Sequence, residues 1–185
     1  MSRPNNIILT GPPGVGKTTV VKKVCESLVA SGANICGFYT EEVRKNGRRI
    51  GFDVVTIDGT RAPLARASNL VTTLTGPLVG QYTVCLESFE DVCLPALHSC
   101  DCDIMVLDEV GKMELFSHSF DARVRQLFSS SGPRILATVP SAGRKGLPLV
   151  EKIKSCPTSL LFVVSHDNRD QLASEILDVL RALTK

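Results

Sequence analysis

The most informative run in the chain is Asn6-Ile-Ile-Leu-Thr-Gly-Pro-Pro-Gly-Val-Gly-Lys-Thr18. Its first five residues are mostly apolar and predict a short buried strand. From Thr18 to Ser31 the apolar residues fall on one face of a helix, which Gly32 is expected to end. Between strand and helix the sequence matches Gly-x4-Gly-Lys-[Ser/Thr] at every fixed position. A strand, a glycine-rich loop and a helix in this order predict a phosphate-binding loop.

Each part of this loop has a physical role in holding a triphosphate. The glycines allow successive backbone N–H groups to face one anion, and the helix N-terminus adds a positive dipole end. Lys17 is expected to reach the β- and γ-phosphates, and the Thr18 hydroxyl is expected to ligate Mg²⁺. A glycine-rich turn that matched by chance would rarely lie between a strand and a helix. The nucleotide-binding residues predicted here are Gly11, Pro12, Pro13, Gly14, Val15, Gly16, Lys17, Thr18 and Thr19.

A second, acidic motif follows a buried strand predicted from Asp103 to Leu107. Phosphoryl transfer to water needs one acid that holds Mg²⁺ and one group that orients the attacking water. Asp108, at the end of the strand, is the candidate for the metal. Glu109 is the candidate for the general base, and Lys17 is the other catalytic residue. The alternative is a polar pair that only marks the end of a strand, which the upstream phosphate loop disfavours.

The rest of the pattern alternates short apolar strands with amphipathic helices, which is typical of an α/β fold with a mostly parallel sheet. Two β-prone runs flank Asn46-Gly47 and predict an inserted antiparallel hairpin. The stretch from Ala67 to Gly80 predicts a loop. Ser88 is a possible cap for a helix in which Pro95 predicts a kink or a late start. Further strands are predicted at 35–40, 81–86, 134–139 and 160–164, and further helices near 116–128 and 172–183.

Length and composition fit one domain that spans residues 1–185. The chain is 43% hydrophobic and carries 21 basic and 19 acidic side chains, for a net charge of +2. This balance does not favour nucleic acid or an anionic membrane as a partner, and no apolar run is long enough to span a bilayer. The seven cysteines lack metal-ligand spacing, so reduced thiols are expected. We expect a cytoplasmic monomer that binds nucleoside triphosphates.

Three more blocks carry a resemblance to a known family: Gly37-Phe-Tyr-Thr-Glu-Glu-Val-Arg44, Gly51-Phe-Asp-Val-Val55 and Leu107-Asp-Glu-Val-Gly-Lys-Met-Glu-Leu115. Together with the phosphate loop, they resemble the small thermophile-type P-loop NTPase family, which includes the animal cancer-related nucleoside-triphosphatases. The resemblance extends from Ile7 to the final helix and is weakest between Thr60 and Gly80.

This resemblance implies a RecA-like P-loop core with an added strand and a catalytic glutamate. It implies Mg²⁺-dependent hydrolysis of nucleoside 5′-triphosphates (ATP, GTP, CTP, UTP and others) to nucleoside diphosphate and phosphate, with low base selectivity. It also implies two nucleotide-binding segments, Gly11 to Thr18 and a second one made of Ile104, Met105, Val106, Leu107, Asp108, Glu109, Val110 and Gly111.

Two other function classes stay open. A nucleoside or nucleotide kinase would phosphorylate an acceptor faster than it hydrolyses the nucleotide. An NTP-dependent regulatory switch would bind a partner in only one nucleotide state. A Ras-type GTPase is disfavoured because the sequence has no Asn-Lys-x-Asp.

Several further residues are weaker candidates for the same site. Lys112 and Thr138 are as consistent with ordinary structural roles as with contact to the γ-phosphate. Arg144 and Lys145 lie in a loop where one of them could serve as an internal arginine finger, although solvated loop residues are more frequent. Glu41 and Glu42 could touch nucleotide or metal, but a solvated strand edge is the simpler explanation. Asn168 and Arg169 could approach the base, although Asp167 or Asn168 could simply cap the last helix. The basic run from Arg44 to Arg49 has no interleaved aromatic residues and is better explained as a solvated hairpin tip than as a nucleic-acid site.

Overall fold

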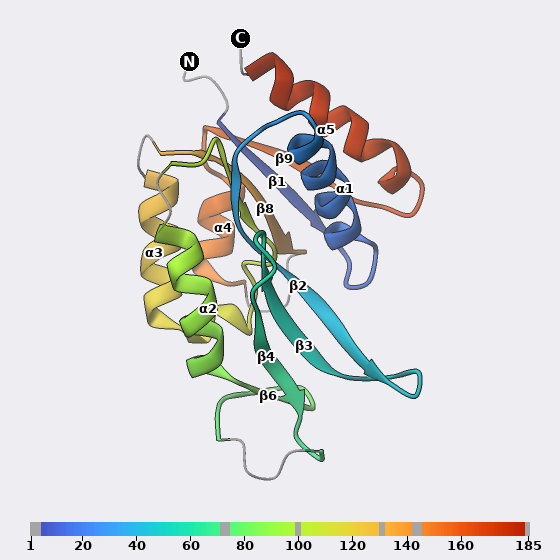
Figure 1. Cartoon of the computed structure of the whole chain (residues 1–185), viewed down its shortest axis with the longest axis vertical. Helices are drawn as coiled ribbons and strands as arrows, with labels where there is room; N and C mark the ends of the chain where they lie inside the picture. The colour runs from blue at the N-terminus through green and yellow to red at the C-terminus, as the bar shows by residue number, and fades with distance from the viewer. Residues whose placement is uncertain (1–4, 71–74, 99–100, 130–131, 142–145, 184–185) are drawn as a thin grey trace.

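The computed structural model describes residues 5–70, 75–98, 101–129, 132–141 and 146–183, which form one mixed sheet with helices on both faces (Figure 1). The strands are β1 (Asn6–Gly11), β2 (Ile35–Lys45), β3 (Arg48–Thr56), β4 (Arg61–Ala67), β5 (Leu78–Val79), β6 (Tyr82–Val84), β7 (Ile104–Leu107), β8 (Arg134–Pro140) and β9 (Ser159–Val163). The helices are α1 (Lys17–Ala30), α2 (Leu86–His98), a 3₁₀ turn η1 (Glu114–Phe116), α3 (His118–Ser129), α4 (Pro148–Lys154) and α5 (Arg169–Leu183).

Five parallel strands form the core of the sheet in the order β2-β7-β8-β1-β9. β8 lies between β1, which leads into the phosphate loop, and β7, which leads into Asp108. This is the RecA-like order with an added strand, so the predicted fold class is confirmed. Every residue of β1 and β7 is buried, as expected for parallel strands that are covered on both faces. The carboxyl ends of β1, β7 and β8 therefore meet at one edge of the sheet.

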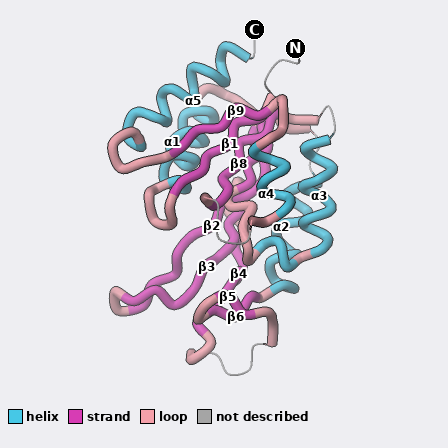
Figure 2. Tube along the Cα trace, turned by 180° about the vertical axis from the view of Figure 1, so that it is seen from behind, coloured by secondary structure: helices cyan, strands magenta, loops and turns pink. Residues whose placement is uncertain are grey.

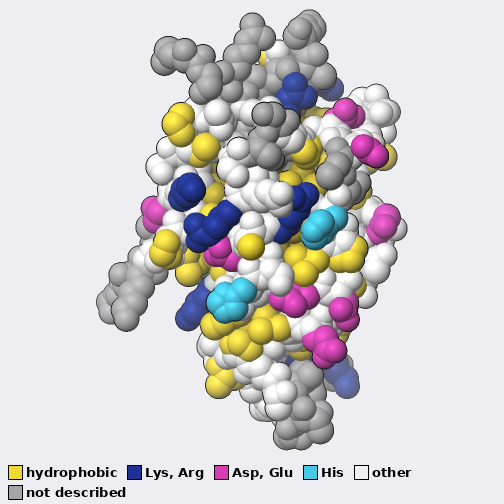
Figure 3. Space-filling model, turned by 90° about the vertical axis from the view of Figure 1, so that its left-hand side faces the viewer, with side chains coloured by type: hydrophobic (Ala, Val, Ile, Leu, Met, Phe, Trp, Pro, Cys, Tyr) yellow, Lys and Arg dark blue, Asp and Glu magenta, His cyan; other side chains and the backbone are white. Residues whose placement is uncertain are grey.

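Two hydrophobic cores lie on opposite faces of the sheet. Figure 1 shows α1 and α5 on one face and α2, α3 and α4 on the other. The first core packs Val21 and Val24 of α1 with Ile176 of α5. The second contains Phe38, Phe89 and Phe120, whose ring centroids lie 5.3 to 6.0 Å apart in edge contacts. Basic and acidic side chains share the surface outside this second core (Figure 3).

The antiparallel part of the sheet is larger than the predicted hairpin. β2 and β3 pair as predicted, but β4, β6 and β5 continue the sheet beyond them. β4 was not predicted, because its sequence Arg-Ala-Pro-Leu-Ala-Arg-Ala has little β-propensity and contains Pro63. Pro63 is tolerated where the β3–β4 register shifts next to Asp53. β5 lies inside the predicted loop from Ala67 to Gly80. Figure 2 shows that these strands extend beyond the layers of helices.

Two helices differ from the sequence predictions. α2 begins at Leu86, before Ser88, and continues through Pro95, so the predicted cap and late start are both wrong. The Ser88 hydroxyl instead donates to the carbonyl of Pro63 at 2.6 Å, which ties α2 to β4. α4 was not predicted, because seven residues give too short an apolar pattern, although Pro148 begins the helix in the position that proline favours. Every helix in the described ranges is too short or too polar to cross a lipid bilayer.

The expectation that all cysteines are reduced thiols is wrong for Cys36 and Cys102, which form a disulfide. Cys36 lies on β2 and Cys102 just precedes β7. These two strands are parallel neighbours, so their beginnings lie at the same edge of the sheet. Cys25, Cys85, Cys93 and Cys156 are free, and Cys100 lies outside the described residues. The disulfide lies at the opposite end of β2 and β7 from the carboxyl ends that carry the predicted chemistry.

Candidate active site

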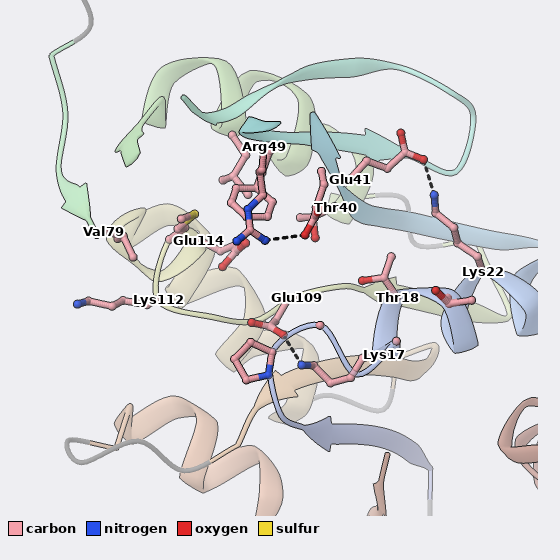
Figure 4. A pocket seen from close by; sticks show the side chains of 18 residues that line it. Lys17, Thr18, Lys22, Thr40, Glu41, Arg49, Val79, Glu109, Lys112 and Glu114 are labelled. Atoms are coloured by element: carbon pink, nitrogen blue, oxygen red, sulfur yellow. Dashed lines mark hydrogen bonds and ion pairs between the residues drawn. The ribbon is translucent and has the colours of Figure 1, made fainter. Parts of the chain in front are cut away.

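A cavity of about 890 Å³ lies where β1 and β7 end (Figure 4). One wall is the loop between β1 and α1, which contributes Gly14 and Lys17. A second wall is the segment after β7, which contributes Glu109 and Met113. The antiparallel strands form the third wall. Segments that lie far apart in the sequence therefore enclose one space, at the edge predicted from the parallel sheet.

Glycine is required at two positions of the phosphate loop. Gly16 has a φ of 108°, which L side chains rarely adopt, and it directly precedes the first residue of α1. A Cβ on Gly11 would lie 2.6 Å from the carbonyl oxygen of Val164, so the end of β1 can approach the segment after β9 only without a side chain. α1 has no side-chain cap at its N-terminus, which leaves the first N–H groups of the helix facing the cavity.

Lys17 is buried against this loop and not extended into solvent. Its Nζ donates hydrogen bonds to the carbonyl oxygens of Gly11, at 3.2 Å, and Pro12, at 3.4 Å. The same Nζ lies 3.4 Å from Glu109 Oε2. The structure thus brings the two predicted catalytic residues into contact, one from each motif.

Asp108 is buried and directly precedes Glu109, which lines the cavity. The Thr138 hydroxyl donates a hydrogen bond to its Oδ1. Burial raises the pKa of Asp108 to about 6, against the opposing effect of the Thr138 and Thr18 hydroxyls. Among the described residues, no group of good geometry donates to its second oxygen, Oδ2. A buried carboxylate oxygen without a partner, close to the Thr18 hydroxyl, fits a divalent cation that completes its remaining coordination with phosphate oxygens and water.

Glu109 directly follows Asp108 in the chain and lines the cavity. Its side chain lies close to the backbone of Gly111, where a larger residue would contact it. The Glu109 side chain is 30% exposed, so water can reach it. A Cβ on Gly111 would lie 2.7 Å from Glu109 Oε1 and 3.0 Å from Glu114 Oε2. Gly111 therefore lets two carboxylates lie on either side of one backbone position.

Glu114 is a buried carboxylate that the sequence predictions missed. Its Oε2 accepts a hydrogen bond from the backbone N–H of Gly111 at 3.2 Å. Burial, with the charge of Glu109 as a second cause, raises the pKa of Glu114 to about 8. Little in the sequence indicates that Glu114 is buried at the site, because a single acidic residue in Gly111-Lys-Met-Glu114 is normally assigned to a solvated turn.

The third wall carries charged residues from β2 and β3. Glu41 faces the cavity and makes ion pairs with Lys22 of α1 and Arg61 of β4. Glu42 pairs with two arginines, Arg44 at 2.7 Å and Arg49 at 2.6 Å. A solvated strand edge had been the simpler prediction for both glutamates. It failed to anticipate that β4 continues the sheet beside β3, so that these strands enclose this side of the cavity.

The weaker candidates have different placements. Lys112 lines the cavity, but its amine extends away from Glu109 (Figure 4). Thr138 is fully buried and its hydroxyl contacts Asp108. Arg144 and Lys145 lie outside the described residues, so their predicted roles stay predictions.

The start of α5 approaches the other side of the phosphate loop. Asn168 directly precedes α5, and its Oδ1 accepts a hydrogen bond from the Ser165 N–H at 2.9 Å. Arg169 Nη1 donates to the carbonyl of Val15 at 3.4 Å. A smaller cavity of about 250 Å³ lies here between Gly16, Thr19 and Arg169. This places Arg169 beside the loop, where the sequence allowed an approach to the base.

The sequence and the fold match known proteins along nearly their whole length. A family model described as NTPase matches residues 6–177. The human cancer-related nucleoside-triphosphatase is 46% identical over 192 residues, which cover 97% of this chain and 98% of that protein. The nucleoside-triphosphatase THEP1 of Thermotoga maritima is 40% identical over 178 residues, which cover 95% of each.

Two solved structures have the same fold. The crystal structure of THEP1 from the hyperthermophile Aquifex aeolicus superposes with a TM-score of 0.82 at 37% identity, covering 95% of this chain and 98% of that one. The solution structure of the human cancer-related nucleoside triphosphatase gives a TM-score of 0.82 at 46% identity and covers 98% of both chains. The resemblance predicted from four sequence blocks is confirmed, and the chain belongs to the NTPase family.

Proposed function

We propose that this protein is a Mg²⁺-dependent nucleoside-triphosphatase that releases phosphate from nucleoside 5′-triphosphates with low base selectivity. The observation that carries the proposal is the 3.4 Å contact between Lys17 Nζ and Glu109 Oε2 inside one cavity. A triphosphate drawn to Lys17 and the loop N–H groups would place its terminal phosphoryl group next to a carboxylate that water can reach. The names of the relatives support the same activity.

Different residues bind the triphosphate and accept the proton in the proposed reaction. The phosphate loop and Lys17 bind the triphosphate, and Lys17 leaves its loop carbonyls to follow the phosphate oxygens. Glu109 orients a water and accepts its proton as the water oxygen bonds to the γ-phosphorus and the bond to the β-phosphate oxygen breaks. The products are the nucleoside diphosphate, which leaves with the β-phosphate oxygen, and inorganic phosphate.

Thr18 and Asp108 are the residues that would hold Mg²⁺. The ion, when bound, neutralises negative charge on the phosphate oxygens. Thr138 keeps Asp108 oriented by hydrogen-bonding to its Oδ1, so that Oδ2 stays free for coordination. The Thr18 hydroxyl and the Asp108 carboxylate would thus act as a preset pair of oxygen ligands, which suits a hard cation.

Low base selectivity is consistent with the groups around the smaller cavity beside α5. Arg169 lies against the Gly16 side of the loop, with its Cδ 3.5 Å from the position of a Cβ there. A guanidinium plane can stack on any base, because every base presents a π-face. We propose that Arg169 contacts the base in this way and does not read one base by its edge. The predicted cytoplasmic location and monomeric state stay predictions.

Replacing Glu109 by Gln tests the proposed reaction directly. The change keeps the size of the side chain and removes its ability to accept a proton. We expect phosphate release to fall about 10²- to 10⁴-fold, while nucleotide binding stays within a few-fold of the original. Phosphate release and equilibrium binding of a nonhydrolysable triphosphate are the two measurements. Glu175→Gln, the same change at an exposed position of α5, is the matched control.

The outcome separates the proposed hydrolase from its rivals. Normal phosphate release by Glu109→Gln would remove Glu109 from the reaction. The same assay, run over the common nucleotides with and without nucleoside and nucleotide acceptors, tests the kinase alternative, which requires faster transfer to an acceptor than to water. A partner bound in only the triphosphate state would instead favour the regulatory switch.

A further inference from the structure

Arg49 enters the cavity from the antiparallel part of the sheet. It lies on β3 and lines the same cavity as Lys17 and Glu109. Figure 4 shows its guanidinium reaching toward the space above Glu109, from the wall opposite the phosphate loop. The sequence pattern had assigned this residue to the basic tip of a hairpin, because the turn Asn46-Gly47 is close in sequence while the cavity is distant.

Three elements hold the Arg49 side chain in place. Its Nε donates to the Tyr82 hydroxyl of β6 at 3.0 Å, and its Nη1 donates to Glu42 Oε1 of β2 at 2.6 Å. The guanidinium carbon lies 5.3 Å from the centroid of the Phe52 ring. The hydrogen bond to Tyr82 is the main cause that raises the pKa of Arg49, so the guanidinium stays charged. A cation held in this way needs little rearrangement when negative charge appears near it.

The charges around Arg49 leave a positive excess on this wall. Glu42 carries one negative charge and pairs with two arginines, Arg44 and Arg49. These three side chains together carry a net charge of about +1, since the ion-paired Glu42 carboxylate and the two guanidinium groups are ionised near pH 7. The wall that faces the phosphate loop can therefore still attract an anion. The Arg49 side chain is 42% exposed, and apolar Phe52, Val79 and Met113 line the cavity together with it.

We propose that Arg49 is an arginine finger supplied within the chain, which contacts the terminal phosphoryl group from the side opposite Lys17. It stabilises the charge that develops on the phosphoryl oxygens as water attacks. The function of the antiparallel extension follows from this role: β2, β3 and β6 fix a cation over a site that the parallel core builds. The inference rests on the proposed hydrolysis and deepens it.

Two substitutions at Arg49 and one beside it test this role. For Arg49→Ala we expect kcat to fall about 10²- to 10³-fold with KM for the triphosphate changed by less than about 3-fold, because the contact strengthens as the reaction proceeds. Arg49→Lys should retain more activity than the alanine variant. Arg48→Ala is the matched control: Arg48 is the neighbouring basic residue of β3, is exposed and is not among the residues that line the cavity.

A purely structural role for Arg49 predicts different results. If Arg49 only ties β2, β3 and β6 together, Arg49→Ala lowers the unfolding temperature and added guanidinium ion does not restore activity. If it acts on the phosphoryl group, millimolar guanidinium restores part of kcat to Arg49→Ala and has no such effect on Arg48→Ala. A kcat for Arg49→Ala within about 3-fold of the original, in a folded protein, would overturn the inference.

Glu109→Gln, measured in the same assay, separates this inference from the proposed function. Loss of activity in Glu109→Gln with retained activity in Arg49→Ala overturns the role of Arg49 alone. Retained activity in both variants overturns the proposed hydrolytic mechanism as well.

Discussion

Glu114 is a residue whose burial has a measurable effect on stability. Its pKa is raised from 4.5 to about 8, mainly by burial. The folded protein thus binds a proton at Glu114 that the unfolded chain releases above about pH 4.5. The associated stability is fully present below that pH and is lost as the pH rises through about 8.

Glu114→Gln should remove this dependence on pH. The amide keeps an oxygen that accepts the Gly111 N–H but carries no charge to bury. The original protein should lose stability as the pH rises from 5 to 9, and the variant should not lose this part. The free energy of unfolding of the variant minus that of the original protein should therefore increase over this range by up to a few kcal/mol. Urea unfolding at several pH values, without Mg²⁺ or nucleotide, measures this. Glu175→Gln serves as the control, and parallel pH curves for Glu114→Gln and the original protein would contradict the prediction.

The residues that could be predicted from the sequence are those whose partners are close in the chain. Lys17 and Thr18 belong to a local loop pattern, and Asp108 and Glu109 belong to a strand end. The rule that parallel strands place their carboxyl ends at one edge was enough to bring these two motifs together. Arg49 and Glu114 could not be predicted in this way. Arg49 depends on how β3, β4 and β6 pair, and Glu114 depends on the depth at which η1 packs.

At the scale of elements, Gly37 sets how closely β2 can lie beside β7. It has a φ of 105°, and a Cβ there would lie 2.0 Å from the carbonyl oxygen of Val106. β2 carries Glu41 and Glu42, and β7 leads to Asp108 and Glu109, so this contact aligns two walls of the cavity. The same glycine begins one of the sequence blocks that carry the family resemblance.

Gly37→Ala should therefore destabilise the sheet more than an ordinary glycine replacement. Gly59→Ala is the matched control, because Gly59 also has a positive φ, 94°, but no atom lies within 4 Å of its Cβ position. We expect a loss of about 1 kcal/mol for Gly59→Ala from its left-handed backbone alone, and at least about 3 kcal/mol for Gly37→Ala, which adds a clash with backbone. Urea unfolding measures both, and equal losses would show that β2 can shift away from β7 without cost.

Strands and helices could be predicted where the apolar pattern of a single segment determines its structure. They could not be predicted where the structure of a segment depends on the strands with which it pairs. β1, β7 and β8 are runs of buried apolar residues, so their sequence alone indicates strands. β4 contains three alanines and a proline and becomes a strand only because β3 and β6 offer hydrogen-bonding edges on both sides. α2 continues through Pro95 to His98, although Pro95 cannot donate the backbone hydrogen bond of its position in the helix.

At the scale of the whole molecule, the cavity is enclosed by parts of the chain that have separate packing partners. The phosphate loop begins α1, which packs with α5, whereas Glu109 follows β7 and Arg49 belongs to the antiparallel extension. A triphosphate bound at Lys17 would contact several of these parts at once. Its binding energy is then added to the stability of the entire fold, because the unfolded chain has no such site.

A nonhydrolysable triphosphate with Mg²⁺ should therefore raise the unfolding temperature of the whole protein in one transition. At a concentration of about 100 times Kd the gain is about 2.7 kcal/mol, which for a chain of this size corresponds to roughly 5–10 °C. Lys17→Ala removes the cation that holds the phosphates and should show little or no shift at the same ligand concentration. Thermal unfolding of both proteins, with and without ligand, provides the comparison. An equal shift in Lys17→Ala would mean that the triphosphate does not bind at the phosphate loop, whereas a shift confined to an early partial transition would mean that the antiparallel extension unfolds independently of the parallel core.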